Sequence, residues 1–242
     1  MSLKHRVLIV MPAFNEQESI AGVIAEVRQH LPEAGCLVVD DGSTDATVDV
    51  ARRAGATVAS LPFNLGVGGA MRFGFMFALE RGYDVVVQID SDGQHNPADV
   101  PRLLAELDSA DIVIGARFAG EGDYVARGPR RWAMSLLSAT LSRTARTRLT
   151  DTTSGFKASG PRAVRFFSVH YPAEYLGDTI ESLTLAARAG LVVRQVPVAM
   201  RERAGGVPSH DPVKSAIYLA RAGIALVFAH TRSAASFRSA MS

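Results

Sequence analysis

The sequence predicts an α/β fold in which a mostly parallel sheet is sandwiched by helices. Two observations support this. Apolar runs such as Arg6 to Met11 and Leu37 to Val39 are continuously hydrophobic, which is typical of strands covered on both faces. Between these runs, the segment from Ile20 to Leu31 places its apolar residues on one face of a helix. Strands covered on both faces and separated by helices indicate an α/β sheet.

The composition fits a folded protein of modest charge. The chain has 242 residues, 48% of them hydrophobic, which is enough for one large domain or two small ones. A net charge of +2 does not point to a nucleic-acid partner. A single cysteine, Cys36, excludes an intrachain disulfide and fits a reducing compartment. We find no signal peptide and no apolar run near the roughly 18 residues of a spanning helix. These features predict a cytoplasmic location.

The first predicted strand is followed by Pro12-Ala-Phe-Asn-Glu16. Asn15 is expected to cap the first helix, with Glu18 three residues later as the second member of a capping box. Pro32 and Gly35 are expected to end that helix. Helix capping accounts for Asn15 but does not require Glu16.

The second predicted strand ends in Asp40-Asp-Gly-Ser-Thr-Asp45. One of the last three residues is expected to cap a helix over 45–53, which leaves Asp40 and Asp41 unexplained. Ligands of open α/β sheets bind outside the carboxyl ends of the strands. Carboxylates at that edge suit the hydroxyl groups of a ribose or the N–H groups of a base.

A third strand is expected over Thr57 to Ser60, followed by a glycine-rich turn at 64–70 and a helix to about Arg81. We expect these glycines to serve the turn and close packing.

An acidic loop follows the next apolar run, Tyr83 to Val87. It reads Gln88-Ile-Asp-Ser-Asp-Gly-Gln-His95 and places two carboxylates one residue apart. Oxygen ligands on a loop suit a hard cation such as Mg²⁺ or Mn²⁺, although the same residue types also form surface turns. His95 is expected to be structural. Asn96 and Pro97 are expected to begin a helix that runs to Leu107, and a strand is expected over 112–116.

The segments at 12–16, 38–45 and 90–95, in this order and spacing, resemble those of family 2 glycosyltransferases with the GT-A fold. Within that family the chain resembles the dolichol-phosphate mannose synthase branch, which transfers sugars to polyprenyl phosphates. The resemblance covers roughly residues 5 to 210. It implies a GT-A domain over residues 1–211, followed by a C-terminal amphipathic helix and tail over 212–242. That helix suits either packing on the domain or peripheral contact with the inner face of the membrane.

The resemblance also implies roles for individual residues. The nucleotide-sugar is expected to contact Pro12, Ala13, Phe14, Glu16, Val39, Asp41, Asp90, Ser91, Arg117 and Arg203. Asp92 and Gln94 are expected to hold Mg²⁺ or Mn²⁺ on the diphosphate. Arg117 suits phosphate because its guanidinium pairs with phosphate oxygens, but it could equally be a surface arginine after a strand.

The second half of the chain is expected to serve the acceptor. A helix is expected over Trp132 to Leu149. The segment Thr150 to Lys157 resembles the family's Asp-x-x-Ser-Gly-Phe motif, which implies that Asp151 and Ser154 position the acceptor; the alternative is a turn between helices. A last strand is expected over Leu191 to Met200, with Pro197 at a sheet edge. After it, Arg203 and Gly206 match the family's Arg-x-x-Gly-x-Ser-Lys pattern, whereas Pro208 and Ser209 depart from it.

The implied function is an inverting, metal-assisted transfer of a sugar from a GDP-mannose or UDP-glucose type of donor to a polyprenyl phosphate. Asp92 and Arg117 would serve catalysis. The alternative within the family is transfer to a hydroxyl of a cell-wall glycan or small molecule, for which Asp178 or Glu181 would act as general base. A phosphate acceptor is already ionised and needs no base. A sugar nucleotidyltransferase would be expected to carry a glycine-rich, basic loop after the first strand, and this chain does not. A catalytically silent nucleotide-binding protein is the remaining alternative.

Overall fold

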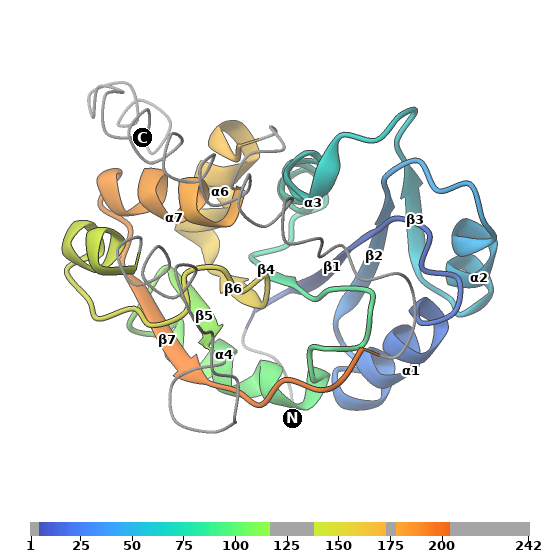
Figure 1. The fold of residues 1–242 in the computed structure, drawn as a ribbon, viewed down its shortest axis with the longest axis horizontal. Helices are drawn as coiled ribbons and strands as arrows, with labels where there is room; N and C mark the ends of the chain where they lie inside the picture. Colours follow the sequence, from blue (N-terminus) through green and yellow to red (C-terminus); the bar gives the residue numbers. More distant parts are fainter. Residues whose placement is uncertain (1–4, 117–137, 173–177, 204–242) are drawn as a thin grey trace, which may run out of the picture.

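The computed structural model describes residues 5–116, 138–172 and 178–203. In these residues it forms a seven-stranded sheet with the order β3-β2-β1-β4-β6-β5-β7 (Figure 1). Every neighbouring pair is parallel except those of β6, which runs antiparallel to both β4 and β5. The strands are β1 (Val7–Ala13), β2 (Gly35–Asp40), β3 (Thr57–Ser60), β4 (Val85–Gln88), β5 (Ile112–Ala116), β6 (Lys157–Ser159) and β7 (Val193–Pro197). The predicted mostly parallel α/β sheet is confirmed.

Helices cover both faces of the sheet, and each face has its own core (Figure 1). Successive residues of β1 alternate between them: Leu8 and Val10 enter one core, whereas Val7, Ile9 and Met11 enter the other. This alternation explains why the strand is apolar at every position. The helices on the first face are α3 (Gly66–Glu80), α6 (Pro161–His170) and α7 (Asp178–Arg188). The helices on the second face are α1 (Ile20–His30), α2 (Thr47–Arg53) and α4 (Val100–Glu106). The 3₁₀ turn η1 (Pro97–Asp99) directly precedes α4.

The prediction that Asn15 caps the first helix was wrong. Asn15 has a φ of 56°, and α1 begins only at Ile20. The Asn15 side chain instead accepts a hydrogen bond from the backbone N–H of Thr44 at 2.8 Å, while its own N–H donates to the Ser43 hydroxyl at 2.9 Å. Asparagine tolerates this left-handed backbone better than most residues. Asn15 therefore ties the loop after β1 to the loop after β2, both at the carboxyl edge of the sheet.

The sequence interpretation also missed β6. The segment Thr150 to Lys157 does not join two helices; it leads into this short strand, which lies between β4 and β5. In the described part of the helix predicted over 132–149, helical residues end at 145, and Arg146 has a φ of 52°. A three-residue strand with the sequence Lys-Ala-Ser carries no apolar run from which it could be recognised.

Other local predictions agree with the structure. Asn96 accepts a hydrogen bond from the N–H of Ala98 at 3.1 Å and so caps the turn that Pro97 begins. Pro197 ends β7, which is the last strand of the sheet and pairs with β5. In the glycine-rich turn predicted at 64–70, Gly66 has a φ of 77°, and a Cβ on Gly69 would collide with Cβ of Leu65, so these glycines permit the turn and its close packing. Among the described residues, no helix is long and apolar enough to cross a membrane.

Candidate active site

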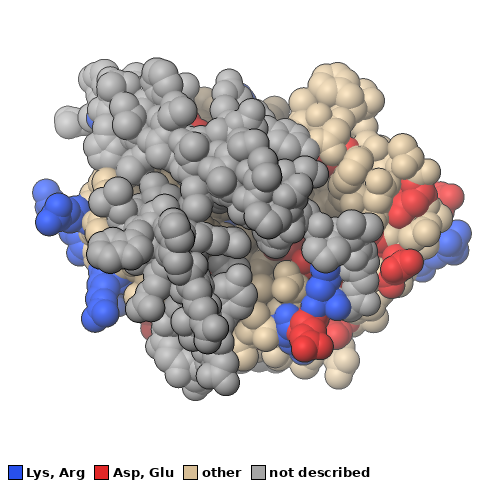
Figure 2. Space-filling model, viewed as in Figure 1, with Lys and Arg blue, Asp and Glu red and all other residues tan. Residues whose placement is uncertain are grey.

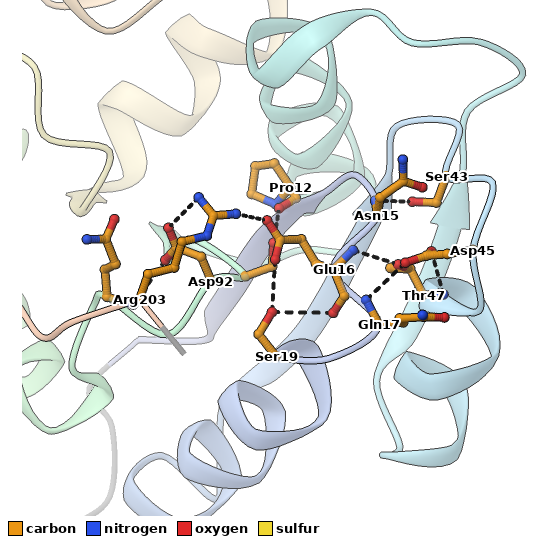
Figure 3. A network of polar contacts seen from close by, with 12 residues as sticks. Pro12, Asn15, Glu16, Gln17, Ser19, Ser43, Asp45, Thr47, Asp92 and Arg203 are labelled. Carbon is orange, nitrogen blue, oxygen red and sulfur yellow. Dashed lines mark hydrogen bonds and ion pairs between the residues drawn. The ribbon is translucent and has the colours of Figure 1, made fainter. Parts of the chain in front are cut away.

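The loops after β1, β2 and β4 meet at the carboxyl edge of the sheet (Figure 3). The hydroxyl of Ser91, after β4, donates to the carbonyl of Pro12 in β1 at 2.9 Å. The N–H of Asp41, after β2, donates to the carbonyl of Ala13 at 2.8 Å. Because neighbouring parallel strands end at the same edge, residues far apart in the sequence gather here. The structure therefore brings together the predicted donor-binding residues of these three loops.

Arg203 joins two of these loops from a distant part of the chain (Figure 3). It lies beyond the end of β7. One guanidinium nitrogen, Nη2, donates to Oε1 of Glu16, and the other, Nη1, lies 3.5 Å from Oδ2 of Asp92. The side chains of Glu16 and Asp92 are each 11% exposed, so their charges are largely withdrawn from water. Buried carboxylates need such a counter-charge, and Arg203 supplies it for both.

Glu16 has a second set of partners. Its Oε2 accepts from the Ser19 hydroxyl at 2.9 Å, and its backbone N–H donates to the Thr47 hydroxyl at 2.8 Å. Burial raises the pKa of the Glu16 carboxyl above its usual range, against the opposing effects of the Ser19 hydrogen bond and of Arg203. Glu16 is thus a buried acid at the edge of the sheet, which explains a residue that helix capping left unexplained.

The two adjacent acids after β2 have different surroundings. Both oxygens of Asp41 accept backbone N–H groups at the start of α3, from Leu65 at 2.7 Å and from Gly66 at 2.8 Å. Asp40 is also buried, and its Oδ1 accepts from the N–H of Ser43 at 3.2 Å. Asp41 therefore has a structural task at the helix N-terminus in addition to the predicted nucleotide contact. The same two hydrogen bonds hold the glycine-rich turn that precedes α3 beside Asp41, at the carboxyl edge of the sheet.

The surroundings of Asp41 predict a pH effect on stability. Burial raises the pKa of Asp41 above 3.8, although the bonds from Leu65 and Gly66 oppose the shift. The folded protein then binds more protons than the unfolded chain at pH values above 3.8, so the stabilisation contributed by Asp41 falls as pH rises through this window. We expect the free energy of unfolding of the wild type, relative to Asp41→Asn, to decrease between about pH 4 and neutral pH. Denaturant titrations at several pH values measure this difference.

Asp45 provides a control of opposite sign. Burial acts to raise the pKa of Asp45, but the hydrogen bonds from Thr47 outweigh it and the net pKa is lowered. Its stabilisation is therefore present at neutral pH and is lost as pH falls. The wild type should lose stability relative to Asp45→Asn on acidification. If the difference in free energy of unfolding between wild type and variant changed with pH in the same direction for Asp41→Asn and Asp45→Asn, the opposite pKa shifts of the two acids would be contradicted.

His95 holds the backbone of Asp90 in place, while the Asp90 side chain stays 40% exposed. The Nδ1 atom of His95 accepts from the N–H of Asp90 at 3.0 Å, and Nε2 of the same ring lies 3.6 Å from Oδ2 of Asp90. The His95 ring stacks on Phe156, with centroids 5.0 Å apart. His95 is thus structural, as predicted. The amide of Gln88 completes the support by donating to Oδ1 of Asp90 at 3.4 Å.

Gly155 lies directly against this carboxylate. A Cβ at Gly155 would be 3.0 Å from Oδ1 and 3.1 Å from Oδ2 of Asp90. The acceptor segment predicted from the sequence therefore does reach the acidic loop. Its two predicted contact residues are both buried: Asp151 Oδ1 accepts from the Thr153 hydroxyl at 3.2 Å, and Ser154 Oγ accepts from the N–H of Phe156 at 3.3 Å. Their contact with an acceptor stays a prediction.

The remaining predicted residues are placed as follows. Phe14 is 46% exposed at the end of β1, whereas Pro12, Ala13 and Val39 are buried within their strands. Glu181 is half-buried in α7, and α7 begins at Asp178, whose side chain is outside the described part of the structure. Arg117 and the predicted C-terminal helix and tail at 212–242 also lie outside the described residues.

The acidic loop fits a divalent cation that also binds phosphate. Oδ1 of Asp92 accepts from the N–H of Gln94 at 3.0 Å, and its other oxygen faces a guanidinium, which shows that the site favours positive charge. Among the described residues, no three His, Cys, Asp or Glu side chains are grouped to hold a metal. Mg²⁺ and Mn²⁺ are often held by one or two carboxylates together with substrate phosphates, and Asp92 offers one such carboxylate. On the side of the molecule that carries α1 and α2, acidic side chains lie among basic ones (Figure 2).

Two residues at the site were missed by sequence reasoning. Gly155 lies in the predicted acceptor motif, but only the folded structure shows that it touches Asp90. Arg201 bonds to Glu26 of α1 and to Asn96, the residue that follows the acidic loop. The cluster of arginines at 201 and 203 was a signal in the sequence, but nothing in the spacing distinguished their roles.

Comparisons with known proteins agree with this geometry. Residues 8–171 match the family described as Glycosyl transferase family 2. An undecaprenyl-phosphate mannosyltransferase of Micrococcus luteus is 36% identical over 208 residues, which are 82% of this chain and 84% of that protein. A polyprenol monophosphomannose synthase of Mycolicibacterium smegmatis is 31% identical over 214 residues, which are 84% of this chain and 80% of that protein.

The fold also has solved counterparts. A crystal structure of glucosyl-3-phosphoglycerate synthase from Mycobacterium tuberculosis, in complex with Mn²⁺, UDP and phosphoglyceric acid, superposes with a TM-score of 0.71. It is 23% identical to this chain and covers 95% of it and 80% of the synthase. At that identity the likeness supports the fold. The fold is thus the GT-A fold, and the family match with the two mannosyltransferase relatives shows that this chain belongs to glycosyl transferase family 2.

Proposed function

We propose that this protein transfers a mannose from a nucleotide-sugar to a polyprenyl phosphate, with a divalent cation at the acidic loop. The observation that carries the proposal is the cluster of Glu16, Asp92 and Arg203 at the carboxyl edge of the sheet. It combines Asp92, an acid that suits a cation, with an arginine that suits phosphate, in a protein of glycosyl transferase family 2. The names of the two relatives support both mannose and a polyprenyl-phosphate acceptor.

The donor would lie across the loops after β1, β2 and β4. Glu16, Asp41 and Asp90 would serve base and ribose, as the sequence resemblance implies. Phe14 is exposed at the same edge and offers an apolar surface for the base. Asp92 and Gln94 would hold Mg²⁺ or Mn²⁺; we favour Mn²⁺ for experiments because the related synthase structure contains it. When bound, the cation would polarise the diphosphate and stabilise its charge.

The chemical step would be a direct displacement. An oxygen of the acceptor phosphate would form a bond to the anomeric carbon while the bond from that carbon to the diphosphate oxygen breaks. The nucleoside diphosphate then leaves with the bonding electrons, and the anomeric configuration is inverted. Negative charge grows on the diphosphate in this step, so Arg203 would contribute most in the transition state. Arg117 is proposed for the same task from its sequence position.

The acceptor would approach past the segment that contains Gly155. An ionised phosphate is itself the nucleophile, so no residue needs to remove a proton from it. Asp178 and Glu181 of α7 would then be dispensable for proton transfer. Asp151 and Ser154 would act by holding the acceptor segment in place, since both are buried. We also propose that residues 212–242 allow peripheral contact with the membrane that contains a polyprenyl phosphate.

Calorimetric titration with GDP and UDP, each with and without Mn²⁺, tests the donor site. We expect one nucleotide to bind, and to bind more tightly with Mn²⁺, because Asp92 and the diphosphate would share the cation. Folded protein that binds neither nucleotide under both conditions would contradict the proposal. A nucleotide dissociation constant that is the same with and without Mn²⁺ would reject the metal role of Asp92 but would still support a nucleotide site.

A further inference from the structure

The segment that follows β7 is hydrogen-bonded to the acidic loop through Arg201. The backbone N–H of Arg201 donates to the carbonyl of Gln94 at 3.0 Å. Its guanidinium donates from Nη1 to Oε2 of Glu26 at 2.6 Å and from Nη2 to Oδ1 of Asn96 at 2.7 Å. Through its backbone and its side chain, Arg201 therefore joins the segment after β7 to helix α1, to the acidic loop and to the residue that follows this loop. Two residues later, Arg203 enters the cluster with Glu16 and Asp92.

We propose that Arg201 is a positioning residue of the donor site, which fixes the backbone so that Arg203 can reach Glu16 and Asp92. The inference rests on the proposed function because it assigns Arg203 to the donor diphosphate. Arg201 itself contacts Glu26 and Asn96 rather than the acids of the cluster. It therefore acts through Arg203.

The geometry favours positioning over a contribution to stability alone. The Arg201 side chain is 42% exposed and its partner Glu26 is 40% exposed. Ion pairs this exposed usually add little to the stability of a fold. A planar guanidinium, however, holds two acceptors in one fixed arrangement, which a lysine ammonium does not reproduce. The Arg201 contacts thus define where the backbone lies more than they stabilise the whole domain.

Arg203 needs such an anchor because its side chain is long and flexible. Its freedom must be restricted before it can face a carboxylate on each side, and that restriction lowers the entropy of the side chain. Fixing the backbone two residues away reduces the positions that the guanidinium can adopt. Gln94 belongs to the same loop as Asp92, and Asn96 follows that loop directly, so the Arg201 contacts also set the separation between Arg203 and Asp92.

A double-mutant cycle tests the proposal. The variants are Arg201→Gln, Arg203→Gln and the double substitution, and the measured quantity is the dissociation constant of GDP or UDP with Mn²⁺, using whichever nucleotide the wild type binds. We expect Arg203→Gln to weaken binding by about tenfold or more and Arg201→Gln by about fivefold. Because Arg201 acts through Arg203, the double variant should bind as weakly as Arg203→Gln alone. Arg201→Lys should recover only part of the loss.

Arg194→Gln is the matched control. Arg194 lies on β7 and pairs with Glu106 at 3.8 Å, with side-chain exposures of 50% and 43%. It should leave nucleotide affinity unchanged. Thermal unfolding of all variants should show similar Tm values. Independent, multiplying effects of the Arg201 and Arg203 substitutions would overturn the positioning role, as would unchanged binding by Arg201→Gln. Wild-type affinity in Arg203→Gln would instead reject the proposed role of Arg203, and absence of nucleotide binding by the wild type would reject the donor site itself.

Discussion

Replacing Asp92 with asparagine is expected to reduce sugar transfer by about a thousandfold or more while the protein still folds. Asparagine keeps the shape of the side chain and can still accept the hydrogen bond that Oδ1 of Asp92 receives from the N–H of Gln94. It removes the negative charge that faces Arg203 and that would bind the cation. A cation on a departing diphosphate contributes several kcal/mol to transition-state stabilisation, and each factor of ten in rate corresponds to about 1.4 kcal/mol. Initial rates at saturating donor, with Mn²⁺ present, measure the loss.

Asp99→Asn serves as the control for the Asp92 variant. Asp99 lies on the next turn of the chain, and its Oδ1 is 3.6 Å from Nη1 of Arg102. It has the same chemistry as Asp92, but its carboxylate faces Arg102 rather than Arg203. We expect it to retain wild-type turnover. Turnover by Asp92→Asn within a few-fold of the wild type would exclude Asp92 as a metal ligand, provided that both variants have unfolding transitions like that of the wild type.

Adding one methyl group at Gly155 is expected to damage the site more than the fold. The Cβ of alanine would lie 3.0 Å from Oδ1 and 3.1 Å from Oδ2 of Asp90, and 3.0 Å from Nε2 of Gln88. These contacts are too close, and the exposed Asp90 carboxylate is the group that can move. Its displacement would disturb the support given by His95 and Gln88. The Asp90 carboxylate would have to shift by a few tenths of an ångström. Because a displacement near 1 Å in a catalytic site can cost about a hundredfold in rate, we expect the smaller shift in Gly155→Ala to reduce transfer by about threefold to tenfold.

Gly160→Ala is the control for the Gly155 variant. It shows whether any glycine-to-alanine change lowers the transfer rate, or only the one that places a methyl group against Asp90. A Cβ at Gly160 would meet the carbonyl oxygen of Asp111 at 3.5 Å and Cδ2 of Leu107 at 3.6 Å, which are ordinary contacts. This variant should keep its transfer rate. The change in Tm should be small for both variants. A Gly155→Ala enzyme with wild-type kinetics would show that the position of Asp90 is not set by this glycine.

The sequence was sufficient to predict the central part of the sheet. Continuous apolar runs identified β1 and β2 because their side chains alternate between two buried cores. The acids at the ends of these strands could be assigned to one edge for the same reason, since parallel neighbours end together. Glu16, Asp90 and Asp92 were chosen as candidate site residues in this way, with the help of the family resemblance, and their roles stay predictions.

Contacts between distant segments could not be predicted. Asn15 fits a helix N-cap by residue type, yet it bonds to the loop at Ser43 and Thr44. Local propensity cannot distinguish a cap from such a bridge, because both use the same side-chain oxygen. Strand β6 has too few residues to show a pattern. The roles of Gly155 and Arg201 depend on distances to other elements, which sequence spacing does not encode.

Mass spectrometry of lipid products tests the central claim most directly. The wild-type protein would be incubated with GDP-mannose or UDP-glucose, Mn²⁺ and undecaprenyl phosphate, and the lipid extract would be compared with that of Asp92→Asn. We expect the wild type to form a polyprenyl phosphate that carries one added hexose, with release of the nucleoside diphosphate, and the variant to form almost none. The absence of a glycosylated lipid, from folded wild-type protein that binds the nucleotide, would contradict the proposed acceptor.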